Sequence, residues 1–344
     1  MGKTGTNWLG PGAGQTAALG VVMALLIQLL PVFLLPGEPL YQQTQNQGTE
    51  SRQGEESIDR TGSSAKDRGR AVRLQTAEGV REVTMEDYLW GVVAAEMPAS
   101  FEEEALMAQA CAARTYTVIQ QSSPKHEGAD ICGDSTCCQA YVEREAALAR
   151  WGLNAGEYED KISRAVAETD GLGILYEGEP IQALFFSSAA GVTADAAQVW
   201  GNGVAYLKSV PSPEGEEVPN YNTRVELTAE EVRQLTLAAY PGADLSGSPD
   251  GWFRDVFRGE EGPVRSLVLG GITLSGSQVR SLFSLRSAAF EVEWNGETFV
   301  FSVTGYGHGV GMSQYGANAM AKEGSTFRDI LTWYYTGTEV KELW

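Results

Sequence analysis

An uncharged run near the N-terminus is the feature that most restricts how this chain can fold. Residues 17–35 read AALGVVMALLIQLLPVFLL, which is 19 residues without a charge. A helix that crosses a bilayer needs roughly 20 predominantly apolar residues. The alternative is a cleaved signal peptide, which has a shorter apolar core and a small-x-small cleavage site after it. No such site follows this run, so the sequence predicts a retained signal-anchor over residues 15–36.

The charges on either side of the run predict its orientation. Lys3 precedes it, and the first charged residue after it is Glu38. Basic residues favour the cytoplasmic side of a membrane, so residues 1–14 are expected to be a cytoplasmic tail. The expected location is therefore the cell membrane, with a single pass and an extracytoplasmic C-terminal domain.

Composition excludes several classes of protein. The chain has 45 acidic and 25 basic residues and a formal net charge of −20, which opposes binding to nucleic-acid phosphates. Four cysteines are too few for a scaffold built on disulfides. Between residues 42 and 69 the only aliphatic side chain is Ile58, so residues 37–70 are predicted to be a flexible linker. The remaining residues, 71–344, are expected to form the catalytic domain.

Local patterns predict an α+β fold. Alternating residues indicate a short hairpin over residues 71–84, followed by a helix that Thr84 caps and that ends near Met97, before a proline. A second, alanine-rich helix follows, with Ser100 and Glu103 as its expected capping box. Strand-like segments occupy residues 172–178, 180–188, 264–271, 289–294 and 297–305, and helical ones occupy 228–240 and 326–335. We expect the helical pair and the mixed β-rich region to form a substrate cleft, with residues 222–300 as a candidate separate lobe.

Two charged residues occupy apolar faces of the helical pair. Glu96 continues the stripe formed by Leu89, Val92 and Val93 at helical spacing. A partly desolvated carboxyl there would have a raised pKa, as a general acid needs, whereas the alternative is a helix-terminal glutamate that faces solvent. Arg114 shares a helix face with apolar residues, so it is either an anion clamp or a structural ion-pair partner.

A histidine and cysteine cluster and a glycine-rich loop are the other candidate sites. His126, Cys132 and Cys138 are spaced six residues apart, which permits either a zinc site or a Cys132–Cys138 disulfide. The loop over residues 305–316 has glycine at five positions and offers His308, Ser313 and Gln314 as polar side chains. This loop is either a tight structural turn or the lining of a cleft.

Five segments together resemble the stage II sporulation protein D family. They read YLWGVVAAEMPASFEEEALMAQACAARTY, DICGDSTCCQAY, FFSSAAGVTADAAQVWGN, YLKSVPSPE and GYGHGVGMSQYGANAMA. The resemblance runs from about Arg73 to Thr338. It implies a membrane-anchored lytic transglycosylase, a lyase that cleaves peptidoglycan glycan strands during engulfment in sporulation.

The resemblance also implies roles for individual residues. The family's catalytic acid corresponds to Glu96, and its other functional positions correspond to Arg114, Tyr206 and Lys208. Met107 replaces a lysine that is common in the family. Some members hold zinc at the spacing of His126, Cys132 and Cys138, and the neighbouring Cys137 could compete as a ligand.

The expected mechanism needs one carboxyl group. Glu96 would protonate the glycosidic oxygen between N-acetylmuramic acid and N-acetylglucosamine, then take the C6 hydroxyl proton as a 1,6-anhydro end forms. Arg114, Tyr206 and Lys208 would hold the sugar, and Ser313, Gln314 and His308 would line the cleft. Zinc would be structural.

Expected partners are peptidoglycan glycan strands, the membrane and the stage II sporulation proteins P and M, with no nucleic acid. The alternatives are a zinc-dependent cell-wall amidase and a non-catalytic peptidoglycan-binding scaffold.

Overall fold

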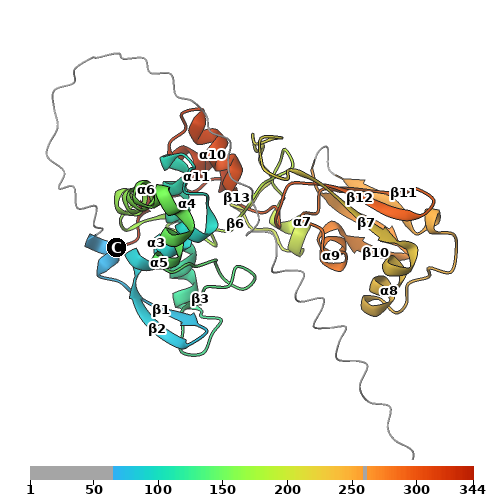
Figure 1. Ribbon diagram of the computed structural model, residues 1–344, viewed down its shortest axis with the longest axis horizontal. Coiled ribbons are helices and arrows are strands. Elements are labelled where there is room, and N and C mark those ends of the chain that lie inside the picture. The colour runs from blue at the N-terminus through green and yellow to red at the C-terminus, as the bar shows by residue number, and fades with distance from the viewer. Residues whose placement is uncertain (1–64, 259–261) are drawn as a thin grey trace, which may run out of the picture. The chain divides into compact units, whose positions relative to one another are not determined.

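A computed structural model describes residues 65–258 and 262–344, which form the mixed α+β fold that the sequence predicts (Figure 1). The helices are α2 (Ala65–Arg68), α3 (Met85–Glu96), α4 (Glu103–Ser122), α5 (Arg144–Trp151), α6 (Ala155–Glu168), α7 (Ala196–Trp200), α8 (Ala229–Ala239), α9 (Gly276–Leu282), α10 (Gln314–Lys322) and α11 (Phe327–Tyr334). The strands are β1 (Ala71–Thr76), β2 (Gly79–Thr84), β3 (Ile131–Cys132), β4 (Leu172–Tyr176), β5 (Glu179–Pro180), β6 (Phe185–Phe186), β7 (Asn222–Thr228), β8 (Phe253–Arg258), β9 (Val264–Leu269), β10 (Ile272–Ser275), β11 (Phe290–Trp294), β12 (Thr298–Thr304), β13 (Met312–Ser313) and β14 (Glu339–Glu342).

The predicted hairpin and first helix are confirmed. Strands β1 and β2 pair antiparallel, and β3 joins β1 in parallel. The Thr84 side chain accepts a hydrogen bond from the backbone N–H of Asp87 at 3.1 Å, so it caps α3 as expected. The helix ends at Glu96, because Met97 adopts the extended conformation that a following proline favours.

The second predicted helix, α4, is confirmed, but its predicted cap is wrong. The N-cap residue is Glu102, and no side chain closes a capping box with Ser100. Instead, the side chain of Asn318 in α10 accepts a hydrogen bond from the Glu102 backbone N–H at 2.8 Å. A tertiary contact from the far end of the chain therefore satisfies this helix start, which local sequence does not reveal.

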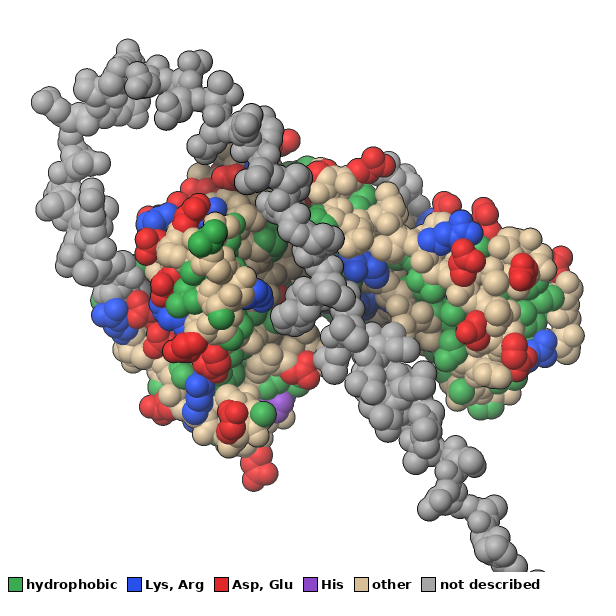
Figure 2. Space-filling view, in the orientation of Figure 1, with side chains coloured by type: hydrophobic (Ala, Val, Ile, Leu, Met, Phe, Trp, Pro, Cys, Tyr) green, Lys and Arg blue, Asp and Glu red, His purple; other side chains and the backbone are tan. Residues whose placement is uncertain are grey.

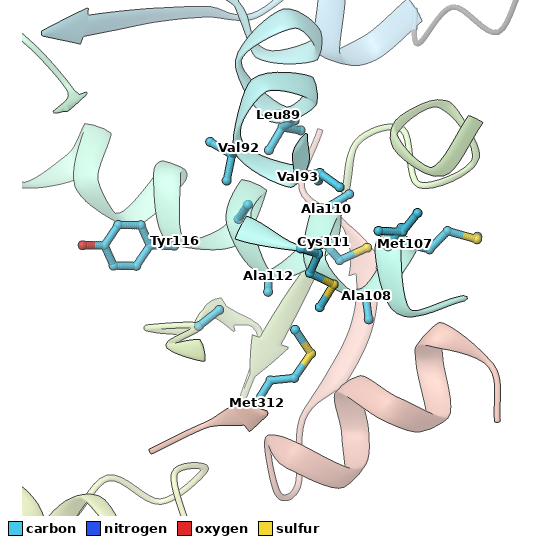
Figure 3. Close-up of a cluster of buried hydrophobic side chains, with 14 of the residues drawn as sticks. Leu89, Val92, Val93, Met107, Ala108, Ala110, Cys111, Ala112, Tyr116 and Met312 are labelled. Atoms are coloured by element: carbon cyan, nitrogen blue, oxygen red, sulfur yellow. The ribbon is translucent and has the colours of Figure 1, made fainter. Parts of the chain in front are cut away.

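Helices α3 and α4 meet in the first hydrophobic cluster. Leu89, Val92 and Val93 of α3 are fully buried, and they lie beside Ala110 and other small or sulfur-containing side chains of α4 (Figure 3). Alanine side chains allow two helix backbones to approach closely, which explains the alanine-rich composition of α4. Close packing of this kind fixes the end of α3, where Glu96 lies.

A second hydrophobic cluster involves only residues 225–303. Strands β7, β11 and β12 form one of its sheets, in the order β11-β12-β7, and β8, β9 and β10 form another. Aromatic contacts centre on Phe299 and Phe301 of β12. A separate core agrees with the candidate lobe at 222–300, although the division of the chain into domains stays a prediction.

The predicted strand over residues 180–188 is mostly absent. Within this segment, Pro180 is the last residue of β5, and Phe185 and Phe186 form β6, which pairs in parallel with Met312 and Ser313 of β13. The segment instead turns at short range, with the Leu184 backbone N–H bonded to the Gln182 carbonyl at 2.9 Å. The pairing of β6 with β13 holds the C-terminal end of the glycine-rich loop in place.

The predicted linker ends earlier than expected. Residues Ala65–Arg68 form helix α2, and Asp67 within it is fully buried. Its carboxylate lies 2.6 Å from the guanidinium of Arg114, which is also fully buried. Since an unpaired charge is costly in the interior, Arg114 requires Asp67, and residues 65–68 are part of the fold.

No helix in residues 65–258 and 262–344 is long and apolar enough to cross a membrane. The signal-anchor predicted at residues 15–36 lies outside the described residues.

We predict that replacing Asp67 will destabilise the fold strongly. Asp67→Ala leaves the Arg114 guanidinium buried without its counter-charge, which should cost about 3–5 kcal/mol in the free energy of unfolding. The matched control is Glu103→Ala, which removes the exposed pair with Arg164 and should cost less than about 1 kcal/mol. Urea unfolding measures both, and equal costs would contradict the structural role of the Asp67–Arg114 pair.

Candidate functional site

The carboxyl group of Glu96 is held between two hydrogen-bond donors. The backbone N–H of Ala140 donates to Oε1 at 2.7 Å, and the side-chain amide of Gln314 donates to Oε2 at 3.1 Å. Glu96 is half-buried. Burial raises the pKa of this carboxyl above its ordinary value, while the two donors oppose the rise because they stabilise the carboxylate. The predicted direction of the pKa shift is confirmed.

Segments far apart in the sequence create this arrangement. Glu96 is the last residue of α3, and Gln314 is the first residue of α10, 218 positions later. Ser313 is the N-cap of α10, and its hydroxyl accepts a hydrogen bond from the backbone N–H of Gly316 at 3.3 Å. The N-cap therefore sets the position from which the Gln314 side chain reaches Glu96.

A buried carboxylate, Glu214, anchors this N-cap and was not identified from the sequence. Ser313 and Ser212 both donate their hydroxyl hydrogen bonds to it, and the backbone N–H of Ala189 donates at 2.6 Å. The side chain of Ser212 also bonds to the hydroxyl of Tyr334 at 2.6 Å. Glu214 closes the segment YLKSVPSPE, and this position in a motif is the one sequence signal that could have indicated it.

Ser313 has a different role from the predicted one. Its side chain is fully buried, so its hydroxyl cannot face a glycan in a cleft. Capping α10 and bonding Glu214 already use this hydroxyl. The prediction of a cleft-lining donor is therefore corrected for Ser313, whereas Gln314 lies in contact with Glu96.

A second glutamine, Gln109, lies next to the Gln314 side chain that bonds Glu96. Gln109 on α4 is fully buried, and its Oε1 lies 3.5 Å from the Gln314 amide nitrogen. Its own amide nitrogen has no hydrogen-bond partner among the described residues. A buried donor without a partner costs about 1–3 kcal/mol, which suits a position close to a site that binds another molecule. The sequence analysis did not single out Gln109.

His308 bonds within and beside the glycine-rich loop, and in the described part of the chain no hydrogen bond joins it to Glu96. Its Nε2 bonds to the Phe185 carbonyl at 3.0 Å, and its Nδ1 accepts from the Val310 backbone N–H at 3.1 Å. This pattern is that of a neutral ring with its proton on Nε2. Burial, aided by the positive charge of Arg280, lowers the pKa of His308 to about 4, so the ring stays neutral at physiological pH.

The three other predicted catalytic residues lie in separate settings. Arg114 bonds to Asp67 and to the Leu172 carbonyl, as expected for the structural ion-pair alternative. The Tyr206 hydroxyl accepts from the Gln182 backbone N–H at 3.0 Å. Lys208 lies 3.4 Å from the Asp195 carboxylate at the surface. Within the described ranges, no hydrogen bond or ion pair joins any of the three to Glu96.

His126, Cys132, Cys137 and Cys138 form one cluster. Their ligand atoms all lie within 4.8 Å of one another, and all of the thiols are free, so the Cys132–Cys138 disulfide is not formed. His126 Nε2 is 3.5 Å from the sulfurs of Cys137 and Cys138, which are 3.9 Å apart. Zinc bonds of about 2.3 Å to sulfur and 2.0 Å to nitrogen, at tetrahedral angles, require separations of roughly 3.5–3.8 Å. The three separations among His126, Cys137 and Cys138 are close to these values, and Cys132 lies within 4.8 Å of them, so the cluster offers a set of ligands that could hold a metal ion.

Comparisons with known proteins show which family the chain is similar to. The family model SpoIID, "Stage II sporulation protein", matches residues 74–176. Stage II sporulation protein D of Bacillus subtilis (strain 168) is 39% identical over 271 residues, covering 77% of this chain and 76% of the relative. The protein of the same name from Bacillus amyloliquefaciens is 37% identical over 266 residues, covering 76% of each chain. An amidase enhancer of Bacillus subtilis (strain 168) is 27% identical over 299 residues, covering 73% of this chain and 40% of the relative.

The fold and site define an α+β protein with a half-buried glutamate at the end of a buried helix and a histidine–cysteine cluster in the loop that supplies one of its hydrogen-bond donors. The chain belongs to the stage II sporulation protein D family, and its role is in sporulation.

Proposed function

We propose that this chain is a membrane-anchored lytic transglycosylase that cleaves peptidoglycan glycan strands during engulfment. The observation that carries the proposal is the Glu96 carboxyl, half-buried and hydrogen-bonded by Gln314, with its pKa raised by burial. A raised pKa keeps part of the population protonated at higher pH, as a general acid requires. The proposed anchor, at residues 15–36, would hold the domain outside the cell membrane.

One carboxyl group suffices for this reaction. Protonated Glu96 gives its proton to the glycosidic oxygen as the bond from C1 of N-acetylmuramic acid to N-acetylglucosamine breaks. The resulting carboxylate then takes the proton of the C6 hydroxyl, whose oxygen bonds to C1. No water is consumed, Glu96 is protonated again, and the product carries a 1,6-anhydro end. The Ala140 and Gln314 donors would orient the carboxylate between these two steps.

A hydrolytic mechanism would use a second carboxylate. Glu214 is a buried carboxylate bonded to Ser313, the residue before Gln314, but it accepts three hydrogen bonds from the protein and is 4% exposed. Because its carboxylate oxygens already accept these hydrogen bonds, Glu214 is better suited to holding the α10 N-cap in place than to activating water. Tyr206 and Lys208 would hold the sugar without bonding to the Glu96 carboxyl, since their partners in the described residues are the Gln182 backbone and Asp195.

We propose further that the histidine–cysteine cluster holds a structural zinc ion. Four protein ligands leave no open position for a metal-bound water, which weighs against a zinc amidase. Cys138 lies two residues before Ala140, whose N–H bonds Glu96. Zinc would thus fix the loop that supplies one of the two donors to the catalytic carboxyl. Glycan strands and the stage II sporulation proteins P and M are the proposed partners.

We predict that Glu96→Gln abolishes cleavage while the fold stays intact. Mass spectrometry of glycan strands incubated with the full chain in detergent should show 1,6-anhydro ends for the unaltered protein and none for the variant. Glu103→Gln, at an exposed ion pair, is the matched control and should retain activity. Reducing ends would indicate a hydrolase, released peptides an amidase and unchanged strands a binding protein, and each would refute the proposal.

We also predict one zinc ion per chain, bound by four residues. Cys137→Ser should weaken zinc affinity at least tenfold in chelator competition, because it removes one of four ligands (a factor of ten is about 1.4 kcal/mol). Cys111→Ala, at a fully buried cysteine outside the cluster, should leave affinity unchanged. Wild-type affinity in Cys137→Ser would show that Cys137 is not a ligand, and no zinc in the unaltered chain would refute the site.

A further inference from the structure

Two arginines beside the glycine-rich loop lack a counter-charge. Arg280 lies in the last turn of α9, and Arg286 lies between α9 and β11. Among residues 65–258 and 262–344, no carboxylate lies within 4.0 Å of either guanidinium group. In a chain with 45 acidic residues, whose carboxylates are spread over the face shown in Figure 2, such a pair is unexpected.

Backbone and ring contacts hold both side chains in place. The Nε of Arg280 donates to the Arg286 carbonyl at 3.1 Å, and the Gly307 backbone N–H donates to the same carbonyl at 3.0 Å. The guanidinium of Arg286 lies 4.0 Å from the centre of the Tyr306 ring. These contacts order the arginines without neutralising them.

The pair is partly removed from water. Both residues are half-buried, and burial lowers the pKa of each guanidinium. The Nε of Arg286 is buried and has no partner among the described residues. Desolvated positive charges without a partner are unfavourable, so the pair is suited to receive an anion. Arg114, by contrast, forms an ion pair with Asp67. Its guanidinium is therefore not free to act as the anion clamp considered from the sequence.

The pair is connected to the catalytic site through the loop and α10. Tyr315 directly follows Gln314, which bonds Glu96. Burial raises the pKa of Tyr315, and the nearby positive charge of Arg286 opposes this rise. The charge of Arg280 acts on His308, and the Gly307 backbone N–H beside it bonds to the Arg286 carbonyl. The two arginines therefore lie next to the loop that leads to Gln314.

We propose that Arg280 and Arg286 form a subsite for the lactyl carboxylate of N-acetylmuramic acid. The inference rests on the proposed function. It adds the chemical group of the glycan strand that the protein would recognise. A planar guanidinium can bind a carboxylate with two parallel hydrogen bonds. Because N-acetylglucosamine has no carboxylate, the subsite would distinguish the two alternating sugars. It would thereby set which of the two glycosidic bonds lies at Glu96.

The test compares two substrates that differ only in this charge. One is glycan strands freed of peptides, so that every lactyl carboxylate is free, and the other is the same strands with those carboxyls converted to amides. For the full chain in detergent, KM should be roughly tenfold lower for the free-acid strands, as expected for loss of a charge-assisted hydrogen bond. Arg286→Gln and Arg280→Gln should each remove most of this preference. Arg254→Gln, at an exposed arginine of the same lobe, should keep it.

The outcomes separate this inference from the proposed function. Equal KM values for the two substrates, with 1,6-anhydro products from both, would overturn the subsite and leave the transglycosylase intact. A preference that persists in both arginine variants would also overturn it. If the unaltered chain cleaves neither substrate, the proposed function fails and the subsite is tested by measuring the binding of both kinds of strand. Tighter binding of the free-acid strands that is lost in Arg286→Gln would then support the subsite, and equal binding would overturn it.

Discussion

The position of one carboxyl group depends on two distant parts of the chain. Glu96 ends a helix whose other residues are largely buried, so its side chain leaves the core at a point where water is partly excluded. Ala140, 44 residues away, and Gln314, 218 residues away, supply its hydrogen bonds. Without both donors a half-buried carboxylate would be poorly solvated. The histidine–cysteine loop and the α10 N-cap are therefore parts of one site.

Buried charges elsewhere in the fold divide into two kinds. Arg114 is paired with Asp67, and Glu214 receives three hydrogen bonds, so both are satisfied within the protein. Arg280 and Arg286 are desolvated yet unpaired in the described part of the chain. Satisfied charges stabilise the arrangement of helices and loops, whereas unsatisfied ones favour a ligand.

The sequence revealed local features and missed those that depend on tertiary contacts. Periodicity and the Thr84 cap predicted α3 and the direction of the Glu96 pKa shift, because neighbouring residues determine both. The Ser100 cap was wrong because α10 supplies the partner instead. Glu214 was missed, since a lone carboxylate in a loop has no pattern until Ser313 and Ser212 are brought to it. The family resemblance assigns a functional role to Arg114, but it could not indicate that Asp67 neutralises the charge of this arginine.

A carboxyl ¹³C NMR titration of Glu96 tests the central claim most directly. The account predicts a pKa above the ordinary glutamate value of 4.5, and a further rise in Gln314→Ala, which removes a donor to the carboxylate. Because the folded state then binds the proton more tightly than the unfolded state, this group's contribution to stability declines as pH rises through the folded pKa. A pKa at or below 4.5, unmoved by Gln314→Ala, would contradict the account.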